Sequence, residues 1–384
     1  MKYYKIILSA ALLAFFSGTA DAVPFSVEAR SLGMGNVRVA TADIATAPFA
    51  NPGMLSFQPS REDFSLLLGI GAFLNDGDGL VDKIDEFQSA YDAGQAGNPG
   101  EALRALDLAR SMLGDVIAPE TTLAFSTGFS GEKWAFAFSA RADAIAAGTV
   151  LTTDPVNPAA YNLVLEGILT TELGVSLASN FQVLGQKLAV GLKPKYVTVD
   201  NVFISESITT VDTGLGDLLD EKNKTDLGDY TTLDLGLVMG MTRHTQIGLV
   251  VTNLVSHKIN FINASGVPST LSFDTQARLG VAYRTDYLTL GADLDLIETD
   301  ALLTNQNFQA LKSQYVSVGG EFNLLDFMQL RIGAQKNIAD DISDAAKDNL
   351  YTAGIGFWFG FNLDLAVVSQ NDSLGGFLQT GFRF

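Results

Sequence analysis

The stretch NLYTAGIGFWFGFNL, residues 349–363, decides the fold class of this chain. It contains no charged residue, and every second position from Tyr351 to Phe361 is apolar or aromatic. The opposite positions include Thr352 and three glycines. Side chains two residues apart share one face of a strand, so the stretch predicts a β-strand with one wholly apolar face. Aromatic residues near both ends of such a strand are expected at the two headgroup levels of a membrane.

The same alternation recurs along the chain, for example over residues 288–296 and 328–335. It predicts about 14 strands, an even number as bacterial membrane barrels require. These strands are expected to begin near Phe64, Thr121, Lys133, Glu166, Lys187, Asp229, Thr245, Thr270, Tyr287, Ser313, Phe327, Asn349, Asn362 and Gly376. The fold class is therefore all-β, a transmembrane antiparallel β-barrel. A soluble β-sandwich is the alternative, because it also alternates, but its apolar face would be less complete.

The connections between these strands alternate in length, as they do in outer-membrane barrels with short periplasmic turns and long outer loops. Short links are expected at residues 130–132, 242–244, 285–286, 325–326 and 360–362. Long loops are expected at residues 75–119, 144–165, 204–228, 256–269, 299–312 and 338–348. The region 273–283 is expected to be one strand with Phe273 on its apolar face.

The N-terminus has the features of a secretory signal peptide. Lys2 and Lys5 precede the uncharged stretch Ile6–Phe16, and Ala20-Asp21-Ala22 supplies the small-x-small pattern that signal peptidase cleaves. The apolar stretch is shorter than the about 20 residues of a membrane-spanning helix. We therefore predict export, with cleavage after Ala22, to the outer membrane of a Gram-negative bacterium.

Composition excludes several classes of protein. The formal net charge of −19 argues against binding nucleic acid, which depends on Lys and Arg neutralising phosphates. The absence of Cys excludes a thiol enzyme and a Cys-ligated metal site. Charged residues make up 17% of the chain, below the roughly 25% of ordinary soluble proteins. The mean hydropathy is nevertheless +0.21, spread over short segments as in a membrane barrel.

The residues between the cleavage site and the first strand, 23–60, are rich in small side chains and poorly periodic. They include Ala29-Arg30-Ser31-Leu32-Gly33-Met34-Gly35 and Phe49-Ala50-Asn51-Pro52-Gly53. Such a segment cannot itself span a membrane, but a wide barrel can enclose it. The predicted organisation is therefore a signal peptide at 1–22, a plug or hatch segment at 23–60 and a barrel at 61–384.

These N-terminal motifs resemble the start of the conjugal-transfer TraF-like outer-membrane proteins, which belong to the wider FadL-like group of hydrophobic-compound transporters. Further matching segments are residues 248–254, 292–296, 329–334 and 378–384. The resemblance implies a 14-stranded barrel, an N-terminal hatch and diffusion of hydrophobic molecules. Its hatch motif maps onto Arg30, Gly33, Gly35, Asn51, Pro52 and Gly53. Gly53 departs from the pattern, which usually has Ala after Asn-Pro, and Gly is conformationally more permissive.

Residues 79–115 are predicted to form a helical insert in an outer loop. Ile84, Phe87 and Tyr91 share one helical face, and Leu103, Leu106 and Leu113 share a second, with a break at residues 97–100. One interpretation is an outer hydrophobic groove that captures an apolar ligand, as in FadL-like proteins. The other is two helices that pack against each other and cap the barrel.

Polar residues on the strands point to a charged lumen. The candidates are Arg278, Asp293, Asp295, Glu321 and Arg331. Charges of both signs indicate paired networks rather than an ion-selective pore. We hypothesise that Arg30 and Arg38 of the plug segment meet some of these acids. Pro194 has no backbone N–H to donate to a neighbouring strand, so a kink, bulge or gap is expected there. Two interpretations are open: a lateral opening into the membrane, or a position at the outer end of the strand.

No motif in the chain predicts an enzyme, a metal or a cofactor. Ser256 and His257 suggest a hydrolase pair, but neighbours on a strand point to opposite faces. The stretch Asn75–Gly79 resembles a Ca²⁺ loop, yet Leu80 occupies a position that needs an oxygen ligand. A tight turn and a polar histidine are the favoured interpretations.

The function predicted from the sequence is binding or passive transport of small hydrophobic molecules across the outer membrane. The alternative is a non-transporting envelope scaffold or assembly component linked to conjugation or secretion. Expected partners are outer-membrane lipids and a small hydrophobic ligand. The final strand ends with Phe382 and Phe384, which resembles the signal read by the outer-membrane barrel assembly machinery.

Overall fold

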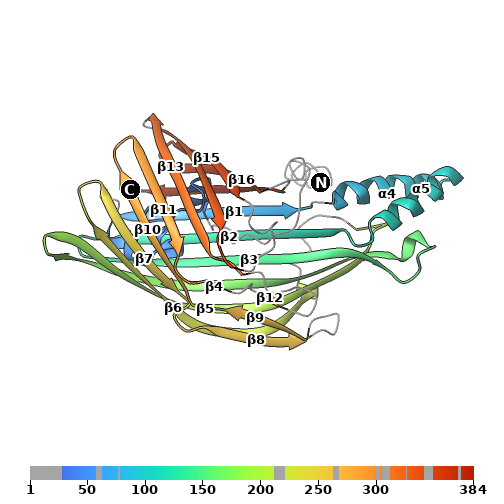
Figure 1. The fold of residues 1–384 in the computed structure, drawn as a ribbon, viewed down its shortest axis with the longest axis horizontal. Helices are drawn as coiled ribbons and strands as arrows, with labels where there is room; N and C mark the ends of the chain where they lie inside the picture. The colour runs from blue at the N-terminus through green and yellow to red at the C-terminus, as the bar shows by residue number, and fades with distance from the viewer. Residues whose placement is uncertain are drawn as a thin grey trace.

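The computed structural model is a closed antiparallel β-barrel of 14 strands (Figure 1), in which each strand pairs with its neighbours along the chain. The structure describes residues 28–57, 63–76, 78–211, 221–262, 268–299, 303–304, 312–325, 327–340, 349–370 and 373–384. The prediction of an all-β barrel with this number of strands is confirmed. The predicted signal peptide lies outside the described residues.

The barrel strands are β1 (Phe64–Asn75), β2 (Val116–Ser130), β3 (Trp134–Thr152), β4 (Tyr161–Val183), β5 (Gln186–Ser207), β6 (Lys224–Gly240), β7 (Thr245–Thr252), β10 (Gln276–Arg284), β11 (Leu288–Asp295), β13 (Tyr315–Leu325), β14 (Met328–Asn337), β15 (Leu350–Trp358), β16 (Asn362–Gln370) and β17 (Ser373–Arg383). A small separate sheet holds β8 (His257–Ile262), β9 (Pro268–Phe273) and β12 (Leu303–Thr304). The main helices are α2 (Ala29–Gly33), α3 (Ala47–Ala50), the 3₁₀ helix η1 (Pro52–Ser56), α4 (Leu80–Gln95) and α5 (Pro99–Ser111). Two further 3₁₀ turns are η2 (Pro158–Ala160) and η4 (Glu221–Asn223).

The barrel closes between its first and last strands. β1 pairs with β17 in a regular register from Ser65↔Arg383 to Leu74↔Leu374. The backbone N–H groups of Asp63 and Phe64 both donate to the carbonyl oxygen of Phe384. The Phe384 ring also lies 5.1 Å, centroid to centroid, from the ring of Phe64. Closure leaves no unpaired edge in the wall, as a sheet surrounded by hydrocarbon requires.

The outer face of the wall is apolar. Leu173, Val175 and Leu177 of β4 are each 44–52% exposed, and the side chains between them point inward. Aromatic rings gather where tight turns join the strands, including the stacked pair Phe129–Phe136 and the pair Phe357–Phe359. An aromatic girdle of this kind is expected where a barrel meets the membrane surface. None of the helices among the described residues is long and apolar enough to cross a membrane.

The strands on one side of the barrel are much longer than those on the other (Figure 1), and the part that extends beyond the short strands is called here the tall part of the wall. Strands β2 to β6 have 15 to 23 residues, whereas β7, β10, β11 and β13 to β16 have 8 to 11. A membrane strand needs only about 9–11 residues. The predicted loops at 144–165 and 204–228 are therefore wrong in extent: β3 continues to Thr152, β4 begins at Tyr161 and β6 begins at Lys224.

The tall part of the wall is covered on both faces. Phe136 and Phe138 of β3 are exposed, so even-numbered residues of β3 point outward. Val150 is also even-numbered and points outward, but it is fully buried because helices α4 and α5 pack against it. On the lumen side, Val197 and Val199 of β5 pack against Ile259 of β8 and Leu271 of β9. The helix pair thus lies against the outer face of the wall, and the β8–β9 hairpin lies inside it.

Candidate functional site: the lumen segment and its chamber

Residues 28–57, called here the lumen segment, lie directly against the inner wall. Glycines of the wall make this approach possible. A methyl group at Gly319 would lie 2.0 Å from the Met34 carbonyl oxygen, and one at Gly333 would lie 2.1 Å from the Gly35 nitrogen. At Gly191 the clash would be with the carbonyl carbon of Pro52, at 2.2 Å. The wall therefore needs glycine at these positions because the segment's backbone fills the space of a side chain.

Asn51 ties the second half of the segment to the wall. Its Nδ2 donates to the carbonyl oxygens of Val39 (3.0 Å) and Leu237 (3.2 Å), while its Oδ1 accepts from the backbone of Gly53 at 3.0 Å. Asn51 is fully buried, so each of these bonds satisfies a group that water cannot reach. A methyl group at Gly53 would lie 3.0 Å from the Gly236 carbonyl oxygen, which makes the Gly in place of the usual Ala a close fit here.

Arg30 connects the first half of the segment to a buried network of charges. Its Nε and Nη2 donate to the two carboxylate oxygens of Glu321 at 2.8 and 2.9 Å. Arg331 donates to the same carboxylate at 2.8 Å and to Asp364 at 2.6 Å. The third Arg30 nitrogen, Nη1, donates to the carbonyl oxygen of Thr41 at 2.6 Å, which braces the segment internally. The pairing hypothesised for Arg30 is present, with Glu321 as the acid.

Arg38 meets an acid through its backbone rather than through its charge. The N–H groups of Arg38 and Val39 donate to Asp293 Oδ2 at 2.7 and 3.0 Å. Among the described residues the Arg38 guanidinium forms no ion pair, in contrast to Arg30. Arg278 and Asp295, predicted as lumen polar groups, pair with each other, with Nη2 to Oδ2 at 3.0 Å. The five predicted lumen residues all face inward, where they surround the segment.

A cavity of about 310 Å³, called here the chamber, lies between the lumen segment and the β8–β9 hairpin. Its lining includes Arg38 and Phe49 of the segment, together with Tyr230 of β6 and Phe273 of β9. The Tyr230 ring stacks on His257 of β8 at a centroid distance of 4.8 Å and contacts Phe273 at 4.9 Å. Aromatic rings of β6 and β9 thus form part of the chamber wall.

Most of the charges around the chamber neutralise each other. Lys193 donates to Glu172 at 2.5 Å, and Lys195 bridges Glu172 and Asp234 at 3.2 and 3.0 Å. Arg141 pairs with Asp143. Because such ions lose most of their water when buried, this pairing offsets the cost of placing them in the lumen.

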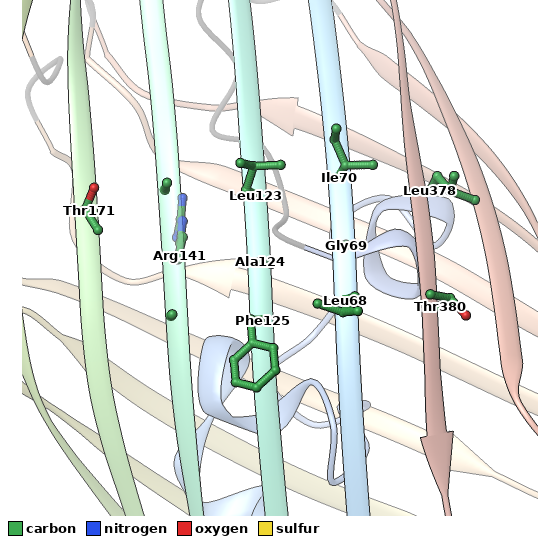
Figure 2. A pocket seen from close by; sticks show the side chains of 12 residues that line it. Leu68, Gly69, Ile70, Leu123, Ala124, Phe125, Arg141, Thr171, Leu378 and Thr380 are labelled. Carbon is green, nitrogen blue, oxygen red and sulfur yellow. The ribbon is translucent and has the colours of Figure 1, made fainter. Parts of the chain in front are cut away.

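On the opposite side of the same wall, an apolar depression of about 470 Å³ faces outward. Figure 2 shows Leu68, Ile70, Leu123 and Leu378 around it, on β1, β2 and β17. Arg141 of β3 contributes to both the depression and the chamber. The ladders from β1 to β4 are continuous at this level, so the wall between the two spaces is closed.

With this geometry in hand, comparison with known proteins identifies the family. The family model described as "F plasmid transfer operon, TraF, protein" matches residues 48–295. The chain belongs to this TraF family. Among the curated proteins, none matches the chain.

Two solved structures show how far the fold of this TraF-family chain is shared. The Ralstonia pickettii toluene transporter TbuX is 12% identical, with a TM-score of 0.54 over 92% of this chain and 97% of that one. A Pseudomonas aeruginosa FadL homologue is 14% identical, with a TM-score of 0.54 over 94% of this chain and 98% of that one. At these identities the likeness establishes the shared fold.

The structure does not bring the predicted groove residues of this TraF-family chain together. Ile84 and Phe87 are buried between α4 and the outer face of the wall, and Tyr91 stacks on Phe87 at 5.6 Å. Leu103 and Leu113 are 67% and 42% exposed, and Leu106 is half-buried. The two helices pack on each other, as one interpretation held, but they lie beside the wall and do not cap the lumen.

Pro194 lies in the middle of β5, and the β4–β5 ladder has no pairs opposite it. Pairing runs from Asn162↔Ser207 to Gly174↔Lys195 and resumes at Leu177↔Leu192 with unchanged register. On its other side Pro194 pairs with Leu233 of β6. The wall therefore has a local interruption without a bulge.

The remaining sequence candidates have structural roles. His257 stacks on Tyr230, and no hydrogen bond joins it to Ser256 in the part of the chain that the structure describes. Asp76 accepts from the backbone N–H groups of Leu80 and Val81, and Asp78 accepts from that of Val116. Both acids thus hold a turn before α4. Within the described residues, no group of acids and histidines is arranged to hold a metal ion.

Phe273 and Glu120 are among the chamber residues that sequence reasoning missed. Phe273 was expected on an outward face, but the strand breaks between β9 and β10, and Phe273 lines the chamber. Glu120 follows the stretch predicted to be a long loop, yet it lies in β2 and faces inward. The signal for Glu120 was present in the parity of β2, because Ala124 and Ser126 on the same face contact the segment.

Proposed function

We propose that this TraF-family protein passively transports small hydrophobic molecules across the outer membrane of a Gram-negative bacterium, without covalent chemistry. The observation that carries the proposal is the lumen segment, which crosses a 14-stranded barrel and leaves a chamber beyond it. The likeness to TbuX, described as a toluene transporter, supports it. Residues 1–22 are the signal peptide in this proposal, residues 23–60 the hatch, and residues 61–384 the barrel.

The proposal assigns each part of the molecule a role. The apolar belt faces outer-membrane lipids, and the segment motif of Arg30, Gly33, Gly35, Asn51, Pro52 and Gly53 blocks free diffusion through the lumen. The last strand, with Phe382 and Phe384, is the part that the barrel assembly machinery recognises. The interruption at Pro194 is the proposed lateral exit, since a wall lacking two ladder pairs opens at lower cost there.

The test is uptake of radiolabelled toluene by Gram-negative cells that produce the protein. We expect faster uptake than in cells with an empty vector and in cells producing an unrelated barrel at equal abundance. Uptake equal to both controls would reject transport of toluene-like compounds. For the exit, Pro194→Val restores the missing donor; uptake that is unchanged in this variant would exclude a lateral route at β5.

A scaffold role in conjugation or secretion is the second candidate, and the helix pair is the observation that favours it. α4 and α5 stand on the outer wall and expose Leu103, so they offer a surface that transport does not need. Crosslinking and co-purification from the envelope would test this. A specific protein partner that is lost in Leu103→Asp, with toluene uptake absent, would favour the scaffold.

A further inference from the structure

Two ionisable side chains that line the chamber form no ion pair with any described residue, although every other Arg, Lys, Asp and Glu on its wall is paired. Arg38 of the lumen segment forms no ion pair among the described residues. Glu120 of β2 is 6% exposed, and its carboxylate has no hydrogen-bond partner there either. Each group was removed from bulk water without the compensation that Lys193, Lys195 and Arg141 receive.

The surroundings of each group make it a strong binding site for an opposite charge. Burial and the neighbouring cations Arg278 and Arg141 lower the pKa of Arg38 to about 10, although the nearby acids Asp293 and Asp295 act in the opposite direction. It therefore stays protonated at neutral pH, and an anion at this point supplies the ion-pair partner that its guanidinium lacks among the described residues. The ionisable neighbour of Glu120 is the acid Asp143, so a cation or hydrogen-bond donor of a ligand would supply the partner that the Glu120 carboxyl lacks among the described residues.

The remaining residues and the volume of the chamber limit the size of a ligand and favour one with an aromatic ring. Phe49, Phe73, Tyr230 and Phe273 supply flat apolar walls suited to a ring. An apolar cavity of about 150 Å³ is enough to hold benzene. The chamber, at about 310 Å³, has room for one ring with two substituents and is too small for a long acyl chain.

We propose that the chamber binds small ring compounds that carry both an anionic group and a cationic or hydrogen-bond-donating group. The anion lies at Arg38 and the donor at Glu120, with the ring among the aromatic side chains. This inference goes beyond the proposed function, because it assigns the chamber a ligand class of its own and expects plain hydrocarbons to bind weakly there. Since Arg38 belongs to the segment and Glu120 to the wall, the ligand bridges the two.

Binding to the detergent-purified protein tests the proposal, using equilibrium dialysis with a matched ligand series. Toluene has neither charge, benzoate has the anion, benzylamine has the cation, and phenylalanine and 4-(aminomethyl)benzoate have both at different spacings. We expect at least one of the two zwitterions to bind about tenfold more tightly than either singly charged compound, and toluene to bind most weakly.

Variants of the two groups make the test specific. Arg38→Gln should reduce zwitterion affinity about tenfold and abolish the advantage of benzoate over toluene. Glu120→Gln should remove the advantage of benzylamine in the same way. Arg110→Gln on α5 and Glu132→Gln in the β2–β3 turn lie away from the chamber and serve as matched controls. Heat-modifiable gel mobility verifies that each barrel is folded.

The results separate this inference from the proposed function. Toluene binding as tightly as the zwitterions, or equal affinity in wild type, Arg38→Gln and Glu120→Gln, would overturn the inference, even if cells take up toluene. Zwitterion binding that depends on both residues supports it, and absent uptake by cells would then reject transport alone.

Discussion

Arg30 shows how one side chain holds a whole segment in place. Its guanidinium satisfies both oxygens of Glu321 and a backbone carbonyl of the segment, in a site where the two charged side chains are 11% and 8% exposed. A planar guanidinium matches a carboxylate in this two-point manner, and a lysine would not. The sequence predicted that Arg30 meets a lumen acid, but which acid depends on barrel register.

Replacing Arg30 should therefore destabilise the protein strongly. We expect Arg30→Met to lower the free energy of unfolding by about 3 kcal/mol, because Glu321 keeps only Arg331 as a partner. Chemical unfolding in detergent micelles measures the change. Arg104→Met, which removes the exposed pairs with Glu86 and Glu101, is the control and should cost under about 1 kcal/mol. Equal costs would show that the buried pair does not hold the fold.

The wall glycines give a second prediction at this scale. Gly333→Ala places a methyl group on the segment's backbone, so the segment must move while the barrel ladders remain. Trypsin should then cut after Arg30 and Arg38 at least tenfold faster in the folded barrel than in wild type, since about 1.4 kcal/mol of lost docking suffices.

Gly376→Ala is the matched control for this change, because its added methyl group would lie 3.5 Å from the nearest atom, an ordinary contact. Its cleavage rate should equal that of wild type. If Gly333→Ala also resisted trypsin, the close packing of segment and wall would not be what protects these arginines.

At the scale of elements, the alternation of residues predicted which strands exist better than where they end. Strands in the belt have one apolar and one polar face, so period two is visible. In the tall part of β3 and β4 both faces are covered, by helices outside and by the hairpin inside. Residues such as Ala144, Ala146 and Leu169 then show no alternation of polarity, and the region resembles a loop.

The candidate groove failed for a related reason. Apolar residues on one face of a helix predict that this face is buried, but they do not show which surface of the protein covers it. Phe87 and Leu103 are both apolar residues of helices α4 and α5, yet one is fully buried against the wall and the other is 67% exposed. Only the tertiary arrangement separates them, and it depends on long strands that local sequence did not reveal.

This difference predicts unequal effects of truncation in the two helices. Phe87→Ala leaves a cavity between α4 and the wall and should destabilise the helix pair by about 3–5 kcal/mol, while the barrel stays closed. Proteolysis within residues 80–111, compared with heat-modifiable gel mobility, distinguishes the local effect from the global one. Leu103→Ala is the control and should leave both unchanged. Loss of the folded barrel in Phe87→Ala would mean that the helices are needed for closure.

At the scale of the whole molecule, the strands of the wall must keep their hydrogen-bonded pairing, whereas the lumen segment has to move if a molecule is to pass through the barrel. The chamber lies on one side of the segment, and the turns that join β2 to β3 and β4 to β5 lie at the far end of those strands. Gly33 of the segment and Gly354 of β15 contact each other: a methyl group on either would lie 3.1 Å from the other's Cα atom. Two cysteines at this point are close enough for a disulfide after a small shift.

The absence of native Cys makes Gly33→Cys with Gly354→Cys a clean lock on the segment. If transport requires the segment to move, oxidised cells should take up toluene at the rate of the empty-vector control, and a reductant should restore uptake. The two single variants separate the lock from the crowding that each new side chain introduces, because neither responds to oxidant. If the fully oxidised double variant took up toluene as fast as wild type, the transport route would pass between a fixed segment and the wall. Gly333→Ala would then change which compounds are transported more than it changes the rate of uptake.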